Sequence, residues 1–372
     1  MQSPSLSHAE PASCAASGAI PANPVLPGKR RAAIGLARKP ILCLIALLAA
    51  LGLSPCAWAA SITAEEILSE FNLVVLGDLV STSEVEGRAY VGGTLSGASS
   101  NFFIHGDQAS PSGHPALIIG GSIEGGAKQV SHGGDAVIGG NLATQLNMNG
   151  GGTRYVQGEV TVKQNGPDAS TVQAPVFVPD LRAAAESLSR DLATGKADSA
   201  VKTQGSRATF EAASGRSGMS IFSIEDGSGF FVGTSELAFD LGEAETIVVN
   251  IGGLVIDVAE NVLGANRTDI ARSVIWNFHE ATTIRFGAEF FGTILAPYAG
   301  ITNSNALNGT VVVGNFVQNG EVHLPEFSAT IPELPGSGGP VEVPEPRSST
   351  LFAGGLLGGA LILRRKSAGR RG

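Results

Sequence analysis

The sequence predicts an all-β protein with one flanking helix, arranged as a parallel β-solenoid with a long α-helix packed alongside. Fifty of the 372 residues are glycine, only 15% are charged and 6% are aromatic, a composition typical of turn-dense β-proteins. Short apolar runs closed by Gly-Gly or Gly-Asn recur along the chain, and one segment has the periodicity of an amphipathic helix. Together these observations favour stacked short strands with a helix beside them.

The repeated runs carry the solenoid prediction. They are Tyr90–Gly93, Ile118–Gly121, Val137–Gly140, Asn250–Gly253 and Val312–Asn315. Gly92 and Gly120 are 28 residues apart, and Gly120 and Gly139 are 19 apart, which suits one solenoid coil with loops of variable length. Each run is too short to bury its own apolar face, so coils must stack, and we expect glycine at corners that need positive φ.

A β-sandwich with glycine-rich hairpins is the alternative fold. Asn149-Gly150, Asn165-Gly166, Asn308-Gly309 and Asn319-Gly320 would all serve as hairpin turns.

The expected helix covers about residues 180–194. It follows Pro175 and Pro179, stops before Gly195, and places one apolar stripe on a single face. The stripe consists of Leu181, Ala184, Leu188 and Leu192. We expect this face to pack along the stack.

Residues 1–60 are predicted to be a signal peptide with an unusually long basic n-region. An apolar run from Ile41 to Leu53 precedes Ala57-Trp58-Ala59, where Ala57 and Ala59 form a small-x-small cleavage site. All three cysteines, Cys14, Cys43 and Cys56, lie in this leader. The exported body is therefore expected to fold without disulfides or thiolate metal sites.

Residues 331–346 read as a Pro/Gly-rich linker, and residues 347–372 as a sorting tail. The tail combines Val343-Pro344-Glu345-Pro346, an apolar run from Leu351 to Leu363, and a basic membrane-stop cluster of Arg364, Arg365 and Lys366. This pattern resembles the PEP-CTERM signal of Gram-negative bacteria. The resemblance implies processing by an exosortase-type membrane protease, a transient inner-membrane stage, and a final place at the cell surface or in the extracellular matrix.

Without the leader and tail, 13 basic residues stand against 32 acidic ones, a net charge of −19. This charge repels nucleic acid and anionic lipid, so no nucleic-acid partner is expected.

Residues 61–330 are expected to form one β domain. The segments Phe71–Leu79 and Ser83–Gly93 resemble the opening of choice-of-anchor A domains, and Gly292–Ala299, Leu307–Val313 and Gly320–Phe327 resemble their closing part. The domain also looks distantly similar to ice-binding solenoids that carry a helix beside a β-stack. The resemblance implies an adhesive surface module that binds extracellular polysaccharide or a surface protein.

We predict no catalytic, cofactor-binding or metal-binding residues and no enzymatic activity, because no catalytic or metal motif occurs. His279-Glu280 and Glu321-x-His323 come nearest to an acid–base or metal pair. Alternation would place Glu84, Glu86 and Arg88 on one strand face, whereas Asp78 is expected to cap a turn.

Two alternatives to the adhesin remain open. A polysaccharide-acting β-helix enzyme, a lyase or hydrolase, would gather several ionisable side chains in one cleft, chosen from Asp78, Glu86, Arg88, Asp135, Lys163 and Arg285. An ice-binding-like surface protein would need regular ranks of Thr-x-Thr on a flat face, whereas the chain offers Thr161 and isolated pairs such as Thr282-Thr283.

Overall fold

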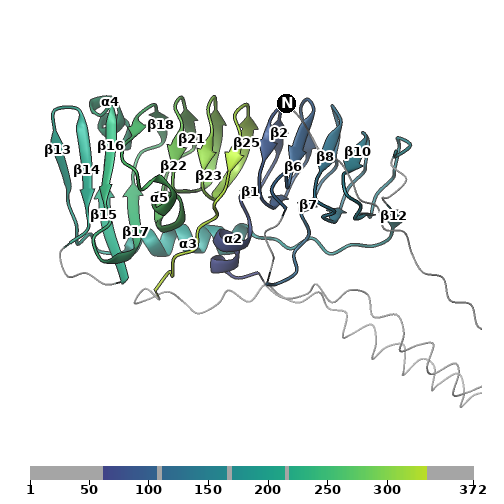
Figure 1. Ribbon diagram of the computed structural model, residues 1–372, viewed down its shortest axis with the longest axis horizontal. Helices are drawn as coiled ribbons and strands as arrows, with labels where there is room; N and C mark the ends of the chain where they lie inside the picture. The colour runs from purple at the N-terminus through teal and green to yellow at the C-terminus, as the bar shows by residue number, and fades with distance from the viewer. Residues whose placement is uncertain (1–61, 107–110, 166–169, 214–217, 333–372) are drawn as a thin grey trace, which may run out of the picture. The chain divides into compact units, whose positions relative to one another are not determined.

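The computed structural model describes residues 62–106, 111–165, 170–213 and 218–332. These residues form a solenoid of short strands stacked in a row, with a helix along one side (Figure 1). The predicted fold class is therefore confirmed.

Most strands belong to one fifteen-stranded sheet, and two smaller sheets complete the coils. The large sheet contains β1 (Leu73–Val75), β2 (Leu79–Ser81), β4 (Ala89–Val91), β5 (Leu95–Ser96), β7 (Leu117–Ile119), β9 (Ala136–Ile138), β11 (Thr153–Val156), β12 (Ser170–Gln173), β15 (Gly218–Ile224), β17 (Ala244–Ile251), β18 (Val255–Val258), β20 (Val274–Asn277), β21 (Thr283–Phe286), β23 (Thr293–Asn303) and β25 (Val311–Gln318). The seven-stranded sheet contains β3 (Glu84–Val85), β6 (Ser100–Phe102), β8 (Lys128–Val130), β10 (Leu146–Met148), β22 (Phe290–Phe291), β24 (Leu307–Asn308) and β26 (Val322–His323). The four-stranded sheet contains β13 (Val201–Gln204), β14 (Arg207–Glu211), β16 (Glu236–Asp240) and β19 (Asn261–Val262).

Among the described strand pairs, only β13 with β14 is antiparallel. A sandwich built from hairpins would need antiparallel neighbours throughout. The alternative fold is therefore wrong, and the Asn-Gly pairs in the described residues mark coil corners or loops; Gly309, for example, has φ +134°.

Each coil has three sides, and side chains alternate between the interior and the outside. In the first coil these sides are β1, β2 and β3. Leu73 and Val75 point into the main core, whereas Val74 between them points outward into a second apolar cluster. The second cluster is the layer between the first side of the coils and the flanking helix.

The first described strand, β1, lies in the middle of the stack, and the later strands fill the stack in two directions. From β1 the coils proceed through β4, β7, β9 and β11 to β12 at one end. Helix α3 (Arg182–Thr194) then leads back, and the chain resumes near β15 at the opposite end of the large sheet. From there β17, β20, β23 and β25 step back until β25 pairs with β1.

Asn72 holds the meeting point of the two halves. Its side-chain Nδ2 donates to the carbonyl oxygens of Gly309 and His323, both at 2.9 Å, and its Oδ1 accepts from the Gly87 N–H at 3.0 Å. Asn72 is fully buried. One amide therefore joins the first coil to the last ones.

Helix α3 packs as its apolar stripe predicts. Leu181, Ala184, Leu188 and Leu192 are all buried in the second cluster. A buried polar network also fixes the helix: Asn277 Nδ2 donates to the Ser189 carbonyl and to Asn250 Oδ1, while Ser189 Oγ donates to Asn277 Oδ1.

Positive φ is found as expected at Gly253 of the Asn250–Gly253 run, but other repeated glycines stack closely on one another for a different reason. Positive φ is not found at Gly92, Gly120 or Gly139. Instead, a Cβ at Gly139 would lie 2.5 Å from the carbonyl oxygen of Gly120 in the coil below, and one at Gly92 would lie 2.5 Å from that of Leu76. Close approach between successive coils therefore excludes any side chain there.

Three short helices were not predicted: α2 (Ala64–Glu70), α4 (Gly227–Gly233) and α5 (Arg267–Ser273). Each has seven residues, too few to show a periodic pattern. Helix α2 begins with a capping box in which Thr63 and Glu66 exchange hydrogen bonds.

Candidate functional site

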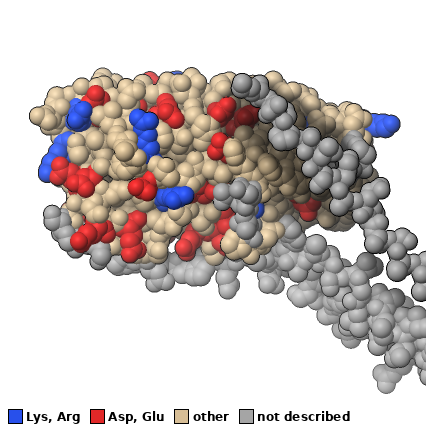
Figure 2. Space-filling view, in the orientation of Figure 1, with Lys and Arg blue, Asp and Glu red and all other residues tan. Residues whose placement is uncertain are grey.

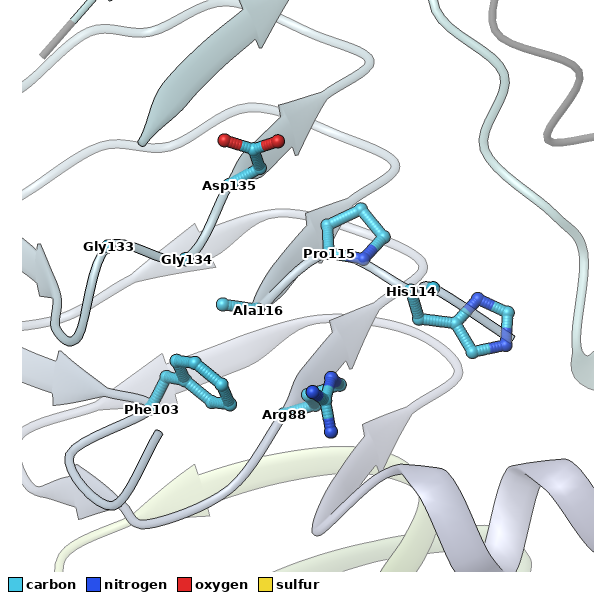
Figure 3. A pocket seen from close by; sticks show the side chains of 9 residues that line it. Arg88, Phe103, His114, Pro115, Ala116, Gly133, Gly134 and Asp135 are labelled. Atoms are coloured by element: carbon cyan, nitrogen blue, oxygen red, sulfur yellow. The ribbon is translucent and has the colours of Figure 1, made fainter. Parts of the chain in front are cut away.

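Two of the six residues proposed for an enzymatic cleft meet in one pocket among the described residues. Arg88 and Asp135 line a pocket of about 240 Å³ together with Phe103 and His114. Figure 3 shows Asp135 on the far side of this pocket from His114. Asp78, Glu86, Lys163 and Arg285 do not line it.

The Arg88 and Asp135 side chains are held by structural contacts. The Arg88 guanidinium lies 5.1 Å from the centre of the Phe103 ring, and burial lowers its pKa although Glu326 and Glu70 oppose that effect. Asp135 Oδ1 accepts from the Thr153 N–H at 2.7 Å in the next coil. Both side chains that line the pocket thus also have structural partners.

The expected alternation of Glu84, Glu86 and Arg88 on one strand is wrong. Strand β3 ends at Val85, and the chain turns at buried Gly87, where a Cβ would lie 2.7 Å from that of Asn72. Arg88 is consequently turned inward and is 6% exposed.

Beside the pocket, helix α2 brings two carboxylates to the loop before β7. Glu66 Oε1 and Glu70 Oε1 lie 2.8 and 2.7 Å from Ser112 Oγ, and His114 is adjacent. Burial alone would raise the pKa of Glu66, but hydrogen bonds from Thr63 and Ser112 and the proximity of His114 lower it overall. Burial lowers the pKa of His114, although Glu70 and Glu66 oppose this shift.

Sequence reasoning missed this cluster. The available signal was the i, i+4 spacing of Glu66 and Glu70, which places both carboxylates on one helix face. His114 is far away in sequence, and only the fold brings it there.

A row of polar side chains runs along the outside of the seven-stranded sheet. Asn147, Gln129, Asn101 and Glu84 lie in register on β10, β8, β6 and β3, and each is half-buried. Exposed Glu321 continues this row, because the following Val322 is in register with Val85 of β3. We call these five residues the polar row.

Hydrogen bonds order parts of this face. Asn101 Nδ2 donates to Glu84 Oε1 at 2.6 Å. The side chains of Glu321-x-His323, which the sequence singles out without predicting a site, are in contact, with His323 Nε2 2.5 Å from Glu321 Oε2. Glu86 then connects the last coil to the first, because its Oε2 accepts from the Leu324 N–H at 2.7 Å.

Among the described residues, the second side of the coils has no regular ranks of threonine. Its outward row includes Asp257, Arg285, Thr302, Val317 and Val80 in register. Arg285 pairs with Asp257 at 3.0 Å, and Val317 and Val80 are about two-fifths exposed. This mixture of charge and aliphatic surface lacks the expected pattern of an ice-binding face.

The other candidates have local structural roles. Asp78 Oδ1 accepts from the Thr94 N–H at 2.8 Å, so it caps a turn as expected. Glu280 accepts from the Gly253 N–H at 3.2 Å. Figure 2 shows acidic side chains spread over the visible face with fewer basic ones between them.

The predicted sorting and cleavage residues lie outside the described residues. They are Ala57, Ala59, Val343, Pro344, Glu345, Pro346, Arg364, Arg365 and Lys366. Within the described part of the chain, no helix is both long and apolar enough to cross a membrane.

Comparison with known proteins identifies a family for most of the chain. Neither the curated proteins nor the solved structures contain a significant match. A family model described as "Putative Ice-binding-like adhesive domain" matches residues 64–324, which run from the first residue of α2 to just beyond β26. The chain therefore belongs to this family of ice-binding-like adhesive domains.

Proposed function

We propose that this protein is a non-catalytic adhesin of the cell surface or biofilm matrix, and that the polar row on the seven-stranded sheet binds polysaccharide. Membership of an adhesive-domain family supports a surface role. The observation that carries the specific proposal is the polar row itself, in which amide and carboxylate groups repeat from strand to strand on a side that α3 does not cover.

The chemistry of the row suits sugar hydroxyls. Amides offer both donors and acceptors, and carboxylates are strong acceptors. Neighbouring strands lie about 4.8 Å apart, so the row presents a regular series of hydrogen-bonding groups along an extended chain. A shallow row of this kind gives low affinity per molecule, and retention then depends on many copies displayed together.

A binding measurement tests this proposal. The purified protein is run in affinity electrophoresis through gels containing bacterial or plant polysaccharides chosen from a glycan array. The double variant Gln129→Ala, Asn147→Ala should no longer be retarded by polysaccharide in the gel. The control double variant Ser96→Ala, Thr161→Ala, on the second side of the coils, should still be retarded. Equal retardation of both double variants would contradict binding by the polar row.

The same preparations test the enzymatic alternative. Release of reducing ends or unsaturated products that disappears in an Asp135→Asn variant would favour a lyase or hydrolase, because Asp135 is the carboxylate lining the pocket. We expect no product, since Arg88 and Asp135 are engaged in structural contacts.

We further propose that the chain is a choice-of-anchor A protein that is exported and then sorted by its tail. The support is the order of sequence features: a basic and apolar leader with Ala57 and Ala59, a β domain over 61–330, a linker, and a tail bearing Pro344-Glu345-Pro346. In this proposal an exosortase-type protease is the processing partner, and the matrix polysaccharide or a surface protein is the final one.

A further inference from the structure

Three potential metal ligands converge where helix α2 meets the approach to β7. One carboxylate oxygen each from Glu66 and Glu70 and one imidazole nitrogen of His114 all lie within 4.8 Å of one another. Glu70 is buried and the other two are half-buried. The three residues come from two segments of the chain that meet only in the folded protein.

The two carboxylates are held in place, with one oxygen of each directed at the same atom. Glu66 Oε2 accepts from the Thr63 N–H at 2.7 Å, which leaves Oε1 directed at Ser112 Oγ. Glu70 Oε1 approaches the same hydroxyl at 2.7 Å. A serine hydroxyl has one proton and can donate to only one of these oxygens at a time.

We propose that Glu66, Glu70 and His114 form a zinc site on the surface of the solenoid. Carboxylate oxygen and imidazole nitrogen are both ordinary zinc ligands. Around an ion with bonds of about 2.0–2.1 Å in tetrahedral geometry, ligand atoms lie about 3.3 Å apart. The present separations of up to 4.8 Å are larger, so zinc binding requires the terminal glutamate torsions to rotate and the hydrogen bonds to Thr63 and Ser112 to shift.

The ligand set selects among cations. Calcium and magnesium prefer coordination by oxygen alone, whereas an imidazole nitrogen favours a transition metal. Three protein ligands leave a fourth position for water or another small ligand, and His114 also lines the neighbouring pocket. The bound ion would join α2 to the β7 loop and so secure the first helix to the N-terminal coils.

Calorimetric titration with zinc chloride tests the site. The full-length, tag-free protein is used with Cys14, Cys43 and Cys56 replaced by serine, so that no thiolate competes, and calcium and magnesium are titrated in parallel. We expect one zinc ion per chain and no comparable binding of calcium or magnesium. Glu70→Gln and His114→Gln should each weaken zinc affinity at least tenfold.

Matched controls separate the site from general surface binding. Glu65 lies on the same helix as the two glutamate ligands, and His105 lies in the same N-terminal half of the chain as His114. The control substitutions Glu65→Gln and His105→Gln should leave zinc affinity unchanged. If a ligand variant unfolds, X-ray absorption spectroscopy of the zinc-loaded parent protein tests the proposal instead. The proposal requires one imidazole and two carboxylates to coordinate the zinc ion. The absence of one-to-one binding, its persistence in both ligand variants, tighter calcium binding, or a different first shell would each overturn the proposal.

Discussion

Two single substitutions at Asn72, to alanine and to aspartate, test whether its amide stabilises the junction between the first and last coils. Asn72→Ala removes three hydrogen bonds and leaves the Gly87 N–H buried without its acceptor. A buried unsatisfied donor costs about 1–3 kcal/mol, and some packing is lost as well. We expect Asn72→Ala to lower the free energy of unfolding by about 2–4 kcal/mol.

Asn72→Asp has nearly the same shape but should be worse at neutral pH. The carboxylate can still accept from the Gly87 N–H. Its second oxygen, however, places negative charge against the Gly309 and His323 carbonyl oxygens, which in the native protein accept hydrogen bonds from the Asn72 amide at 2.9 Å. Burial and these two acceptors would raise the pKa of the new carboxyl, because both disfavour its charged form. Stability should therefore recover as the pH falls and the carboxyl gains a proton that it can donate.

Urea unfolding followed by circular dichroism at pH 7.5 and pH 4.5 measures both effects. Relative to the parent protein at each pH, Asn72→Asp should be the least stable variant at pH 7.5 and should approach or pass Asn72→Ala at pH 4.5. Asn147→Asp, at a half-exposed outward position, serves as the control and should change stability by less than about 0.5 kcal/mol. An aspartate variant as stable as the alanine variant at pH 7.5 would refute the assigned role of the Asn72 amide.

The remaining predictions concern the helix, a buried carboxyl and the tail. Leu188→Asp should lower the free energy of unfolding by about 3–5 kcal/mol, because it places a charge where α3 packs on the stack; unchanged melting would remove α3 from the core. Burial raises the pKa of Glu260 to about 7, so the stability that its protonated form contributes at pH 4 is lost as the pH rises through 7. Glu260→Gln should consequently stabilise the protein at pH 8, by up to about 3 kcal/mol, and have little effect at pH 4; equal urea midpoints for both proteins at pH 8 would contradict this sign. Replacing Pro344, Glu345 and Pro346 with alanine in a host that has an exosortase should leave a larger form in the inner membrane, as judged by fractionation and immunoblotting, and unchanged size and location would oppose the proposed sorting signal.

The sequence contained enough information for the type of fold. Recurring Gly-Gly runs at coil-sized intervals indicated stacking, and the stripe of Leu181, Leu188 and Leu192 indicated the buried face of α3 correctly. The expected positive φ holds at Gly253 but not at Gly92, Gly120 or Gly139, because spacing alone does not distinguish a tight corner from close contact between coils. That distinction depends on a second chain segment, here the carbonyl of Gly120 beneath Gly139.

The order of the coils and the Glu66–Glu70–His114 cluster could not be predicted in the same way. Leu73 pairs with Val311, and no local pattern indicates a contact between such distant positions. The cluster likewise depends on the fold, since His114 reaches α2 only after β1, β4 and β7 have aligned. Sequence patterns such as apolar periodicity therefore predicted single strands and helices, whereas contacts between segments far apart in the sequence depend on the order in which the strands pair.

This topology also bears on how the proposed adhesin would present its polar row. The last described residues return to the side of the stack that carries α3: Ile331 packs on the second apolar cluster, and the Thr330 carbonyl accepts from Thr246 Oγ1 at 2.6 Å on β17. A tail that continues from this point starts on the helix side of the body. The seven-stranded sheet forms another side of the coils, so an anchor in the tail need not cover Gln129 or Asn147. The pairing of β25 with β1 is matched by the pairing of β26 with β3, so the polar row continues across the junction between the first and last coils.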